Sequence, residues 1–222
     1  MQNADAAWLA WQVVDSAFPS GAFAHSWGLE AAWQQGEIAN RADLERFVVA
    51  SIQQAGHATL PLVNSAYRTP YRLEALDELA DAFLLNAVAN RVSRVQGRTL
   101  IATVVRVWPS ATTVALKARA GATCAHLAPV VGAALRTIGL ALPTVQQIVL
   151  FSTARGVLSA AVRLGIVGSY DAQRMQFDCG PWLDRTLAEC GTLDEDSLAQ
   201  TAPIVDLLQA GHDRVYSRLF QS

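Results

Sequence analysis

The sequence predicts an all-α protein, a single-domain bundle of about eight to ten helices spanning residues 1–222. Apolar residues recur at helical spacing along most of the chain, and no strand-like segment has a hairpin partner. A length of 222 residues fits one sizeable domain. No repeat, low-complexity tract or long linker divides the chain. These observations together favour one helical core.

The first predicted element lies in DSAFPSGAFAHSWGLEAAWQQG, residues 15–36. Its Pro-Ser-Gly triplet predicts a turn, and Gly36 stands where a glycine often follows a helix end. Between them we expect an amphipathic helix, in which Phe23 and Trp27 lie four residues apart and anchor it in the core. Small residues such as Gly28 would let another helix approach closely.

The same stretch holds the residue types of a nucleophilic triad, His25, Ser26 and Glu30. Neighbouring residues on a helix point about 100° apart, so His25 and Ser26 do not align as base and nucleophile. Glu30 is five residues beyond His25, outside the spacings at which helical side chains meet. No Gly-x-Ser-x-Gly or His-Glu-x-x-His pattern occurs. We therefore expect no catalytic residues here, and a surface stripe that a partner protein recognises.

The next predicted helix begins at Asn40, a good N-cap with Asp43 three residues later. Pro61 either kinks this helix or starts a new one. A further amphipathic pattern over residues 72–97 predicts one long helix that Gly97 ends.

The second half of the chain is more apolar. Residues 99–109 are rich in β-branched side chains, but we predict a helix there because no partner strand exists. Residues 123–140 and 143–168 are apolar nearly all round, which predicts central helices. Thr192 and Glu195 predict a capping box for a helix over residues 194–209.

Composition limits the possible functions. A net charge of −2 and a pI near 6.1 provide no basic surface for nucleic acid. Charged residues are 16 % of the chain, against about 25 % usually, which indicates either an unusually compact, alanine-rich chain or a surface that a partner partly covers. No secretory signal is recognisable, and the apolar run over residues 127–143 is too short to cross a membrane. We expect a cytoplasmic location.

Metal and cofactor sites are not expected from the residue spacing. Three cysteines without a Cys-x-x-Cys pair argue against disulfides and structural zinc. The four histidines are scattered, and Cys124 and His126 form the one close Cys/His pair.

One enzymatic alternative remains open. Asp77 and Asp81 lie one helical turn apart, as carboxylates do in all-α enzymes that bind magnesium and a prenyl diphosphate. A second motif should follow downstream, but Gly97 stands where its acid is needed. A solvated acidic face is the simpler interpretation of the pair.

The chain ends in HDRVYSRLFQS, residues 212–222, which carries apolar and arginine side chains at helical spacing. Two aromatic residues and a leucine so close to a terminus should be covered. They either fold back on the core or become ordered against a partner, for which tyrosine, phenylalanine and arginine are common anchors.

These segments resemble the UreF family of urease accessory proteins. The opening DSAFPSGAFAHSWGLE, the central LSAAVRLGIVGSYDAQ and the terminal HDRVYSRLFQS are similar to three blocks of that family, in the same order. Less distinctively, NAVANRVSRVQG resembles a polar family helix. The chain departs from the pattern at Ala22, Trp27 and Ser169.

The resemblance implies an all-α adaptor without catalytic residues or a cofactor of its own. Its expected partners are a second copy of the chain, UreD (also called UreH), the GTPase UreG and apo-urease. The assembled complex, rather than this chain, would handle nickel and insert it in a GTP-dependent step, with UreG activity modulated by this chain. A C-terminal tail over residues 212–222 would become ordered on UreD. The residues assigned to partner binding are Phe23, His25, Ser26, Gly28, Glu30, Arg163, Gln173, Val215, Tyr216, Ser217, Arg218, Leu219 and Phe220.

Overall fold

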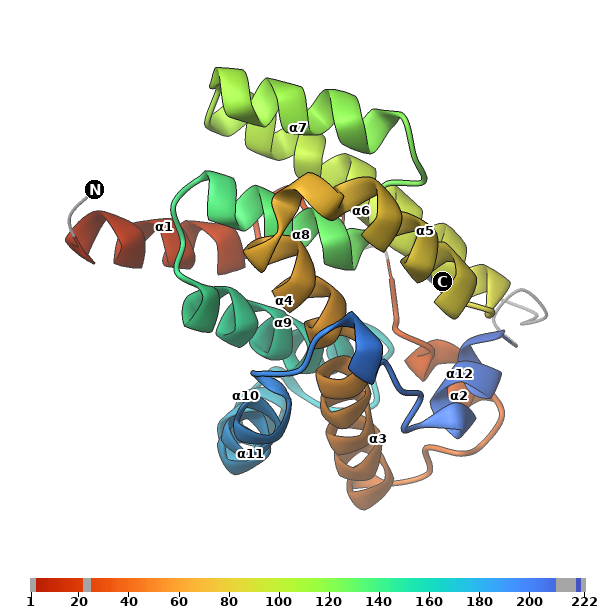
Figure 1. The fold of residues 1–222 in the computed structure, drawn as a ribbon. Coiled ribbons are helices and arrows are strands. Elements are labelled where there is room, and N and C mark those ends of the chain that lie inside the picture. The colour runs from red at the N-terminus through yellow and green to blue at the C-terminus, as the bar shows by residue number, and fades with distance from the viewer. Residues whose placement is uncertain (1–2, 22–24, 211–218, 221–222) are drawn as a thin grey trace.

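Two apolar helices, α8 and α9, lie at the centre of the fold, and the other helices pack around them (Figure 1). A computed structural model describes residues 3–21, 25–210 and 219–220, and these contain no β-strand. The all-α prediction is confirmed. The α-helices are α1 (Asn3–Val14), α2 (Leu29–Gln34), α3 (Arg41–Gln54), α4 (Leu60–Arg68), α5 (Leu73–Phe83), α6 (Ala87–Val107), α7 (Ala111–Gly121), α8 (Leu127–Thr137), α9 (Leu142–Arg163), α10 (Ser169–Asp178), α11 (Gly180–Cys190) and α12 (Pro203–Ala210).

The core has two main parts, which α9 joins. One contains buried residues of α6, α7, α8 and the first half of α9, among them Leu135. The other contains buried residues of α2, α3, α10 and the second half of α9, among them Leu44. By length and hydropathy α9 could cross a membrane, but 56 % of its most apolar stretch is buried within the fold. Its composition is that of a core helix, as the sequence predicted.

Helix α3 begins with the predicted N-cap, Asn40. The Asn40 side chain accepts from the backbone N–H of Asp43, whose carboxylate accepts in return from the Asn40 N–H. A π-helical turn, Ala55–Thr59, then separates α3 from α4, and Pro61 lies in the first turn of α4. Proline at a helix start loses no hydrogen bond, so a new element begins there.

The long helix predicted over residues 72–97 is wrong, because α5 ends at Phe83 and α6 begins at Ala87. The Asn86 side chain accepts hydrogen bonds from the N–H groups of Val88 and Ala89, which starts a new helix. Gly97 does not end a helix and lies inside α6 instead.

The helix predicted over residues 194–209 is also wrong. A short 3-10 turn, Glu195–Ser197, and the separate α12 replace it. Glu195 does not cap a helix, because its carboxylate binds the Ser65 hydroxyl and the Arg72 guanidinium. Distant partners on α4 and beside it therefore outcompete the local cap.

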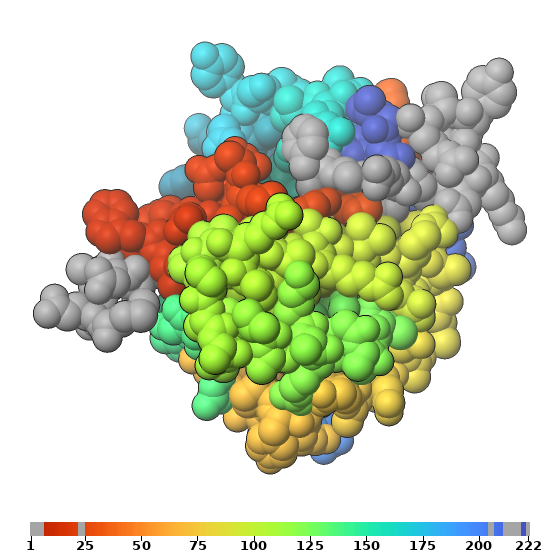
Figure 2. Space-filling view, turned by 90° about the horizontal axis from the view of Figure 1, so that it is seen from above, coloured from red at the N-terminus to blue at the C-terminus, as the bar shows by residue number. Residues whose placement is uncertain are grey.

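Helix α1 extends beyond the rest of the molecule in both Figure 1 and Figure 2, where it is red. Leu9 is buried against the core, while Trp8 and Trp11 are exposed on the outer side. Exposed tryptophans on a projecting helix agree with the expectation that partners cover part of this surface.

Candidate functional site

The opening stretch folds differently from its prediction. Helix α2 covers only Leu29–Gln34, and it is preceded by Trp27 and Gly28 with positive φ angles of 60° and 85°. Left-handed residues do not propagate a right-handed helix, so no helix runs through His25 and Ser26. The prediction of one helix from the Pro-Ser-Gly turn to Gly36 is therefore wrong. Phe23 lies outside the described residues.

Position 28 requires glycine for two reasons, its left-handed backbone conformation and the close approach of a neighbouring helix. An added Cβ would lie 3.1 Å from the Cβ of Gln209 on α12, in a backbone conformation that side chains disfavour. The close approach predicted for this small residue is observed, with α12 as the neighbour.

The predicted polar surface stripe is also wrong, because these side chains are buried. His25, Ser26 and Glu30 expose 5, 0 and 1 % of their surface. The left-handed step at Trp27 and Gly28 changes the direction of the chain, and the helical spacing assumed for the stripe no longer applies. These groups thus belong to the interior, where polar atoms require hydrogen-bond partners.

Glu30 binds the end of the chain. One carboxylate oxygen accepts from the Leu219 backbone N–H at 2.6 Å, and the other accepts from the Phe220 N–H at 3.3 Å. Phe220 is buried against the core part that contains α2 and α3, whereas Leu219 is 55 % exposed. The carboxylate therefore fixes the backbone here and leaves one apolar side chain outside.

Arg163, at the end of α9, packs on the ring of Phe220. Its guanidinium carbon lies 4.0 Å from the ring centroid, a cation–π contact. Burial lowers the pKa of Arg163, and the nearby Glu30 carboxylate opposes that shift. The group stays charged, since arginine titrates far above neutral pH.

Glu30, Arg163 and Phe220 thus form one cluster, which we call the tail anchor. Its members come from the three sequence blocks that resembled the UreF family, and they lie 133 and 57 residues apart along the chain (163 − 30 and 220 − 163). Of the other predicted partner-binding residues, Gln173 is exposed on α10. Val215, Tyr216, Ser217 and Arg218 lie outside the described residues.

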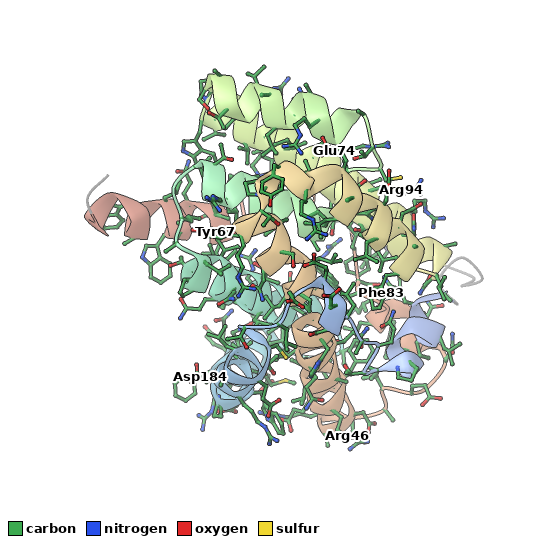
Figure 3. The ribbon with its side chains drawn as sticks, in the orientation of Figure 1. Arg46, Tyr67, Glu74, Phe83, Arg94 and Asp184 are labelled. Atoms are coloured by element: carbon green, nitrogen blue, oxygen red, sulfur yellow. The ribbon has the colours of Figure 1, made fainter. Side chains whose placement is uncertain are left out.

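Asp77 and Asp81 do not form a carboxylate pair open to magnesium and diphosphate. Asp77 is buried, and its oxygens accept from the backbone N–H groups of residues 124, 125 and 126 at 2.8, 3.1 and 2.5 Å. Asp81 accepts from Arg94 at 2.5 Å and from Asn90 at 2.9 Å (Arg94 is labelled in Figure 3). The solvated acidic face expected of the pair is wrong as well, because both carboxylates hold protein groups.

The pKa of Asp81 lies well below its usual value. The hydrogen bond from Arg94 has the largest effect, followed by those from Asn90 and His126. The sequence did not predict that His126 and Cys124 meet Asp81 in space. In the sequence, the Cys-Ala-His spacing was the available signal for this cluster, but nothing near it indicated Asp81 as the third member.

Comparisons with known proteins agree with the pattern of the three blocks. The UreF family model matches residues 38–180. The chain is 34 % identical over 221 residues to urease accessory protein F of Arabidopsis thaliana, covering 97 % of this chain and 92 % of the relative. It is 33 % identical over 224 residues to urease accessory protein F of Oryza sativa subsp. indica, covering 98 % and 86 %.

A bacterial relative shows similar coverage. Urease accessory protein UreF of Mycolicibacterium vanbaalenii is 31 % identical over 211 residues, covering 94 % of this chain and 95 % of the relative. These alignments extend well beyond the residues that the family model matches, so they include nearly all of the chain. The chain therefore belongs to the UreF family of urease accessory proteins.

Proposed function

We propose that this chain is a cytoplasmic adaptor that joins UreD and the GTPase UreG on apo-urease during nickel insertion. Membership of the urease accessory family places the chain in urease maturation and implies a role without catalysis of its own. The tail anchor is the observation that carries the finer proposal, because it joins the three family-like blocks around the chain end.

The tail anchor supports a UreD contact at the C-terminus. Glu30 holds the backbone of residues 219 and 220, and Leu219 remains exposed beside the buried Phe220. An apolar side chain next to a fixed backbone loses little entropy on binding. We assign the UreD contact to Val215–Leu219, with Glu30 and Phe220 as positioning residues.

Contact with UreG is assigned to the side of the molecule formed by the end of α9 and by α10. Gln173 is exposed there, and Arg163 touches Phe220 through its guanidinium group. Arg163 would couple the order of the tail to the activity of UreG. His25, Ser26 and Gly28 are buried next to the start of α2, and we assign them a supporting role in the interior. We also propose that the chain acts as a homodimer, and that nickel is handled by the assembled complex without a cofactor in this chain.

A reconstitution experiment tests the adaptor proposal. The purified chain is mixed with UreD and UreG from the same organism, and complex mass is read by light scattering. Wild type should form the ternary complex. A chain truncated after Asp213, and the variant Phe220→Ala, should lose UreD. A chain truncated after Phe220 is the matched control and should bind normally, because the tail anchor is intact.

Two outcomes would contradict the proposal at different levels. Normal assembly of the Asp213 truncation would show that the tail does not contact UreD. Failure of wild type to bind either protein would remove the adaptor role itself. UreG turnover measured with Arg163→Gln, at full complex formation, then tests whether Arg163 acts on the GTPase.

A further inference from the structure

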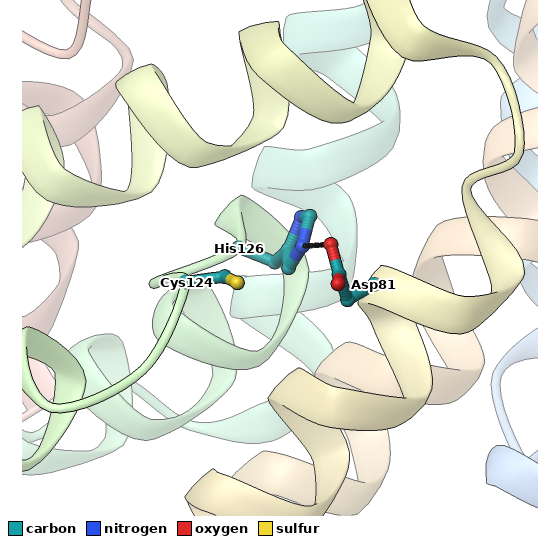
Figure 4. A group of neighbouring side chains, drawn as sticks. All are labelled: Asp81, Cys124 and His126. Carbon is teal, nitrogen blue, oxygen red and sulfur yellow. Dashed lines mark hydrogen bonds and ion pairs between the residues drawn. The ribbon is translucent and has the colours of Figure 1, made fainter.

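The loop between α7 and α8 brings three metal-ligating side chains together. Cys124 and His126 face Asp81 on α5, and their ligand atoms all lie within 4.8 Å of one another (Figure 4). His126 is completely buried, and its Nε2 atom lies 3.1 Å from an Asp81 oxygen. Among the described residues, these three form the one group of His, Cys, Asp or Glu side chains close enough to hold a metal ion.

The backbone of this loop is held in an unusual conformation. Ala125, between the two ligand candidates, is buried and has a φ angle of 58°. The Asp77 carboxylate accepts three consecutive N–H groups from residues 124–126, which is a nest of the kind that binds anions. This bonding offsets the cost of the left-handed residue and presents Cys124 and His126 on the same side.

Helix α6 supports the loop from the other side. An added Cβ at Gly97 would lie 2.0 Å from the carbonyl oxygen of Ala125, so only glycine allows this approach. Ser93 Oγ accepts from the Leu127 N–H at 3.1 Å and lies 3.1 Å from His126 Nδ1. When the imidazole carries its proton on Nδ1, that N–H donates to Ser93, and the Nε2 atom, which donates to Asp81 in the other tautomer, presents a lone pair to it. A lone pair facing a carboxylate requires a proton or a metal cation between them.

The hydrogen bonds of Asp81 leave one of its oxygens available. Arg94, Asn90 and His126 all contact Oδ1, and no described residue binds Oδ2. Arg94 and Asn90 can therefore keep the carboxylate in place while Oδ2 faces an ion. Such outer-shell hydrogen bonds are a regular feature of protein metal sites.

We propose that Asp81, Cys124 and His126 bind one divalent ion of the zinc class through a carboxylate oxygen, a thiolate and Nε2. Thiolate and imidazole ligands select borderline ions, and three protein ligands leave a fourth position for water or a partner's side chain. Tetrahedral bonds of about 2.0–2.3 Å place ligand atoms about 3.5 Å apart, a small adjustment from the present spacing. Binding releases the Cys124 thiol proton to solvent, and the ion takes the place of any proton on Nε2. The inference does not rest on the proposed function.

Cobalt and zinc titrations of the full, reduced chain test this site. Co²⁺ should produce a near-ultraviolet thiolate-to-cobalt charge-transfer band that saturates at one ion per chain. Zn²⁺ should displace it. Cys124→Ser should abolish the band, and His126→Gln and Asp81→Asn should weaken binding by about tenfold or more. Cys179→Ser and His57→Gln are the matched controls, because neither residue belongs to the cluster, and both should bind as wild type does.

Alkylation offers a second readout. Burial raises the pKa of the Cys179 and Cys190 thiols, so both should react slowly with iodoacetamide. Half-buried Cys124 should react faster, and Zn²⁺ should protect it. Absence of the cobalt band in wild type, or unchanged zinc affinity in folded Cys124→Ser, would overturn the proposal. Circular dichroism of each variant without metal identifies any variant that fails to fold. If a variant does not fold, the test rests on wild type, in which failure of Zn²⁺ to protect Cys124 from alkylation would overturn the proposal.

Discussion

At the scale of single residues, buried acids hold the backbone of distant segments. Glu30 binds residues 219 and 220, and Asp77 binds residues 124–126. A carboxylate accepts several N–H groups at once, and a buried one must do so to offset its desolvation. In both places an acid that looked like a surface group in the sequence is part of the internal structure.

Replacing Glu30 with glutamine should release the chain end. The amide keeps the size of the side chain but offers one acceptor oxygen and no charge, so one buried N–H loses its partner. The free energy of unfolding should fall by about 1–3 kcal/mol, measured by urea denaturation. Amide hydrogen exchange at Leu219 and Phe220 should become faster.

The matched control is Glu37→Gln, because Glu37 is exposed after α2. Its stability should change by less than about 0.5 kcal/mol. Equal effects of the two substitutions would show that Glu30 does not anchor the tail.

Asp81 should make stability depend on pH in the acid range. Its pKa is lowered in the folded chain, chiefly by Arg94, so the folded state binds fewer protons than the unfolded state as pH falls. The stabilisation is present at neutral pH and is lost progressively below about pH 5. Urea midpoints measured from neutral to acid pH should fall less steeply in Arg94→Gln than in wild type. An identical slope in the two proteins would contradict the role of Arg94.

At the scale of elements, glycine and caps decide where helices meet and end. Gly97 lies inside α6 and permits the close approach of Ala125, while the Asn86 cap separates α5 from α6. The periodic pattern over residues 72–97 indicated helix correctly. It did not reveal that the Asn86 cap divides this stretch into two helices, because apolar periodicity continues across the cap.

Gly97→Ala should be strongly destabilising, because its Cβ would lie 2.0 Å from a backbone oxygen. Either α6 or the Cys-Ala-His loop must move, at a cost of about 1–3 kcal/mol or more. Thermal unfolding provides the measurement. Gly121→Ala is the control, because a Cβ there meets nothing within 4 Å, and alanine favours helix. Stability of Gly97→Ala equal to wild type would contradict the close packing of α6 on the loop.

At the scale of the whole molecule, α9 unites the two parts of the core. Its first half packs with α8, and its second half packs with α3 and α10. We expect one cooperative unfolding transition. Leu135→Ala in one part and Leu44→Ala in the other should each cost about 2–5 kcal/mol and lower the same melting temperature. Two separate transitions by calorimetry would show that the parts unfold independently.

The sequence by itself determined the helical class, the Asn40 cap, a break in the helix pattern near Pro61 and the family. Periodicity, caps and motifs depend on residues within a few positions of one another, so they can be read without a fold. The burial of Glu30, the tail anchor and the cluster of Asp81, Cys124 and His126 were decided only by the tertiary structure. Asp81 and His126 lie 45 residues apart in the sequence, Glu30 and Phe220 lie 190 apart, and helix packing brings each pair together. Two left-handed residues, Trp27 and Ala125, redirect the chain at these sites, and helical spacing cannot anticipate such residues.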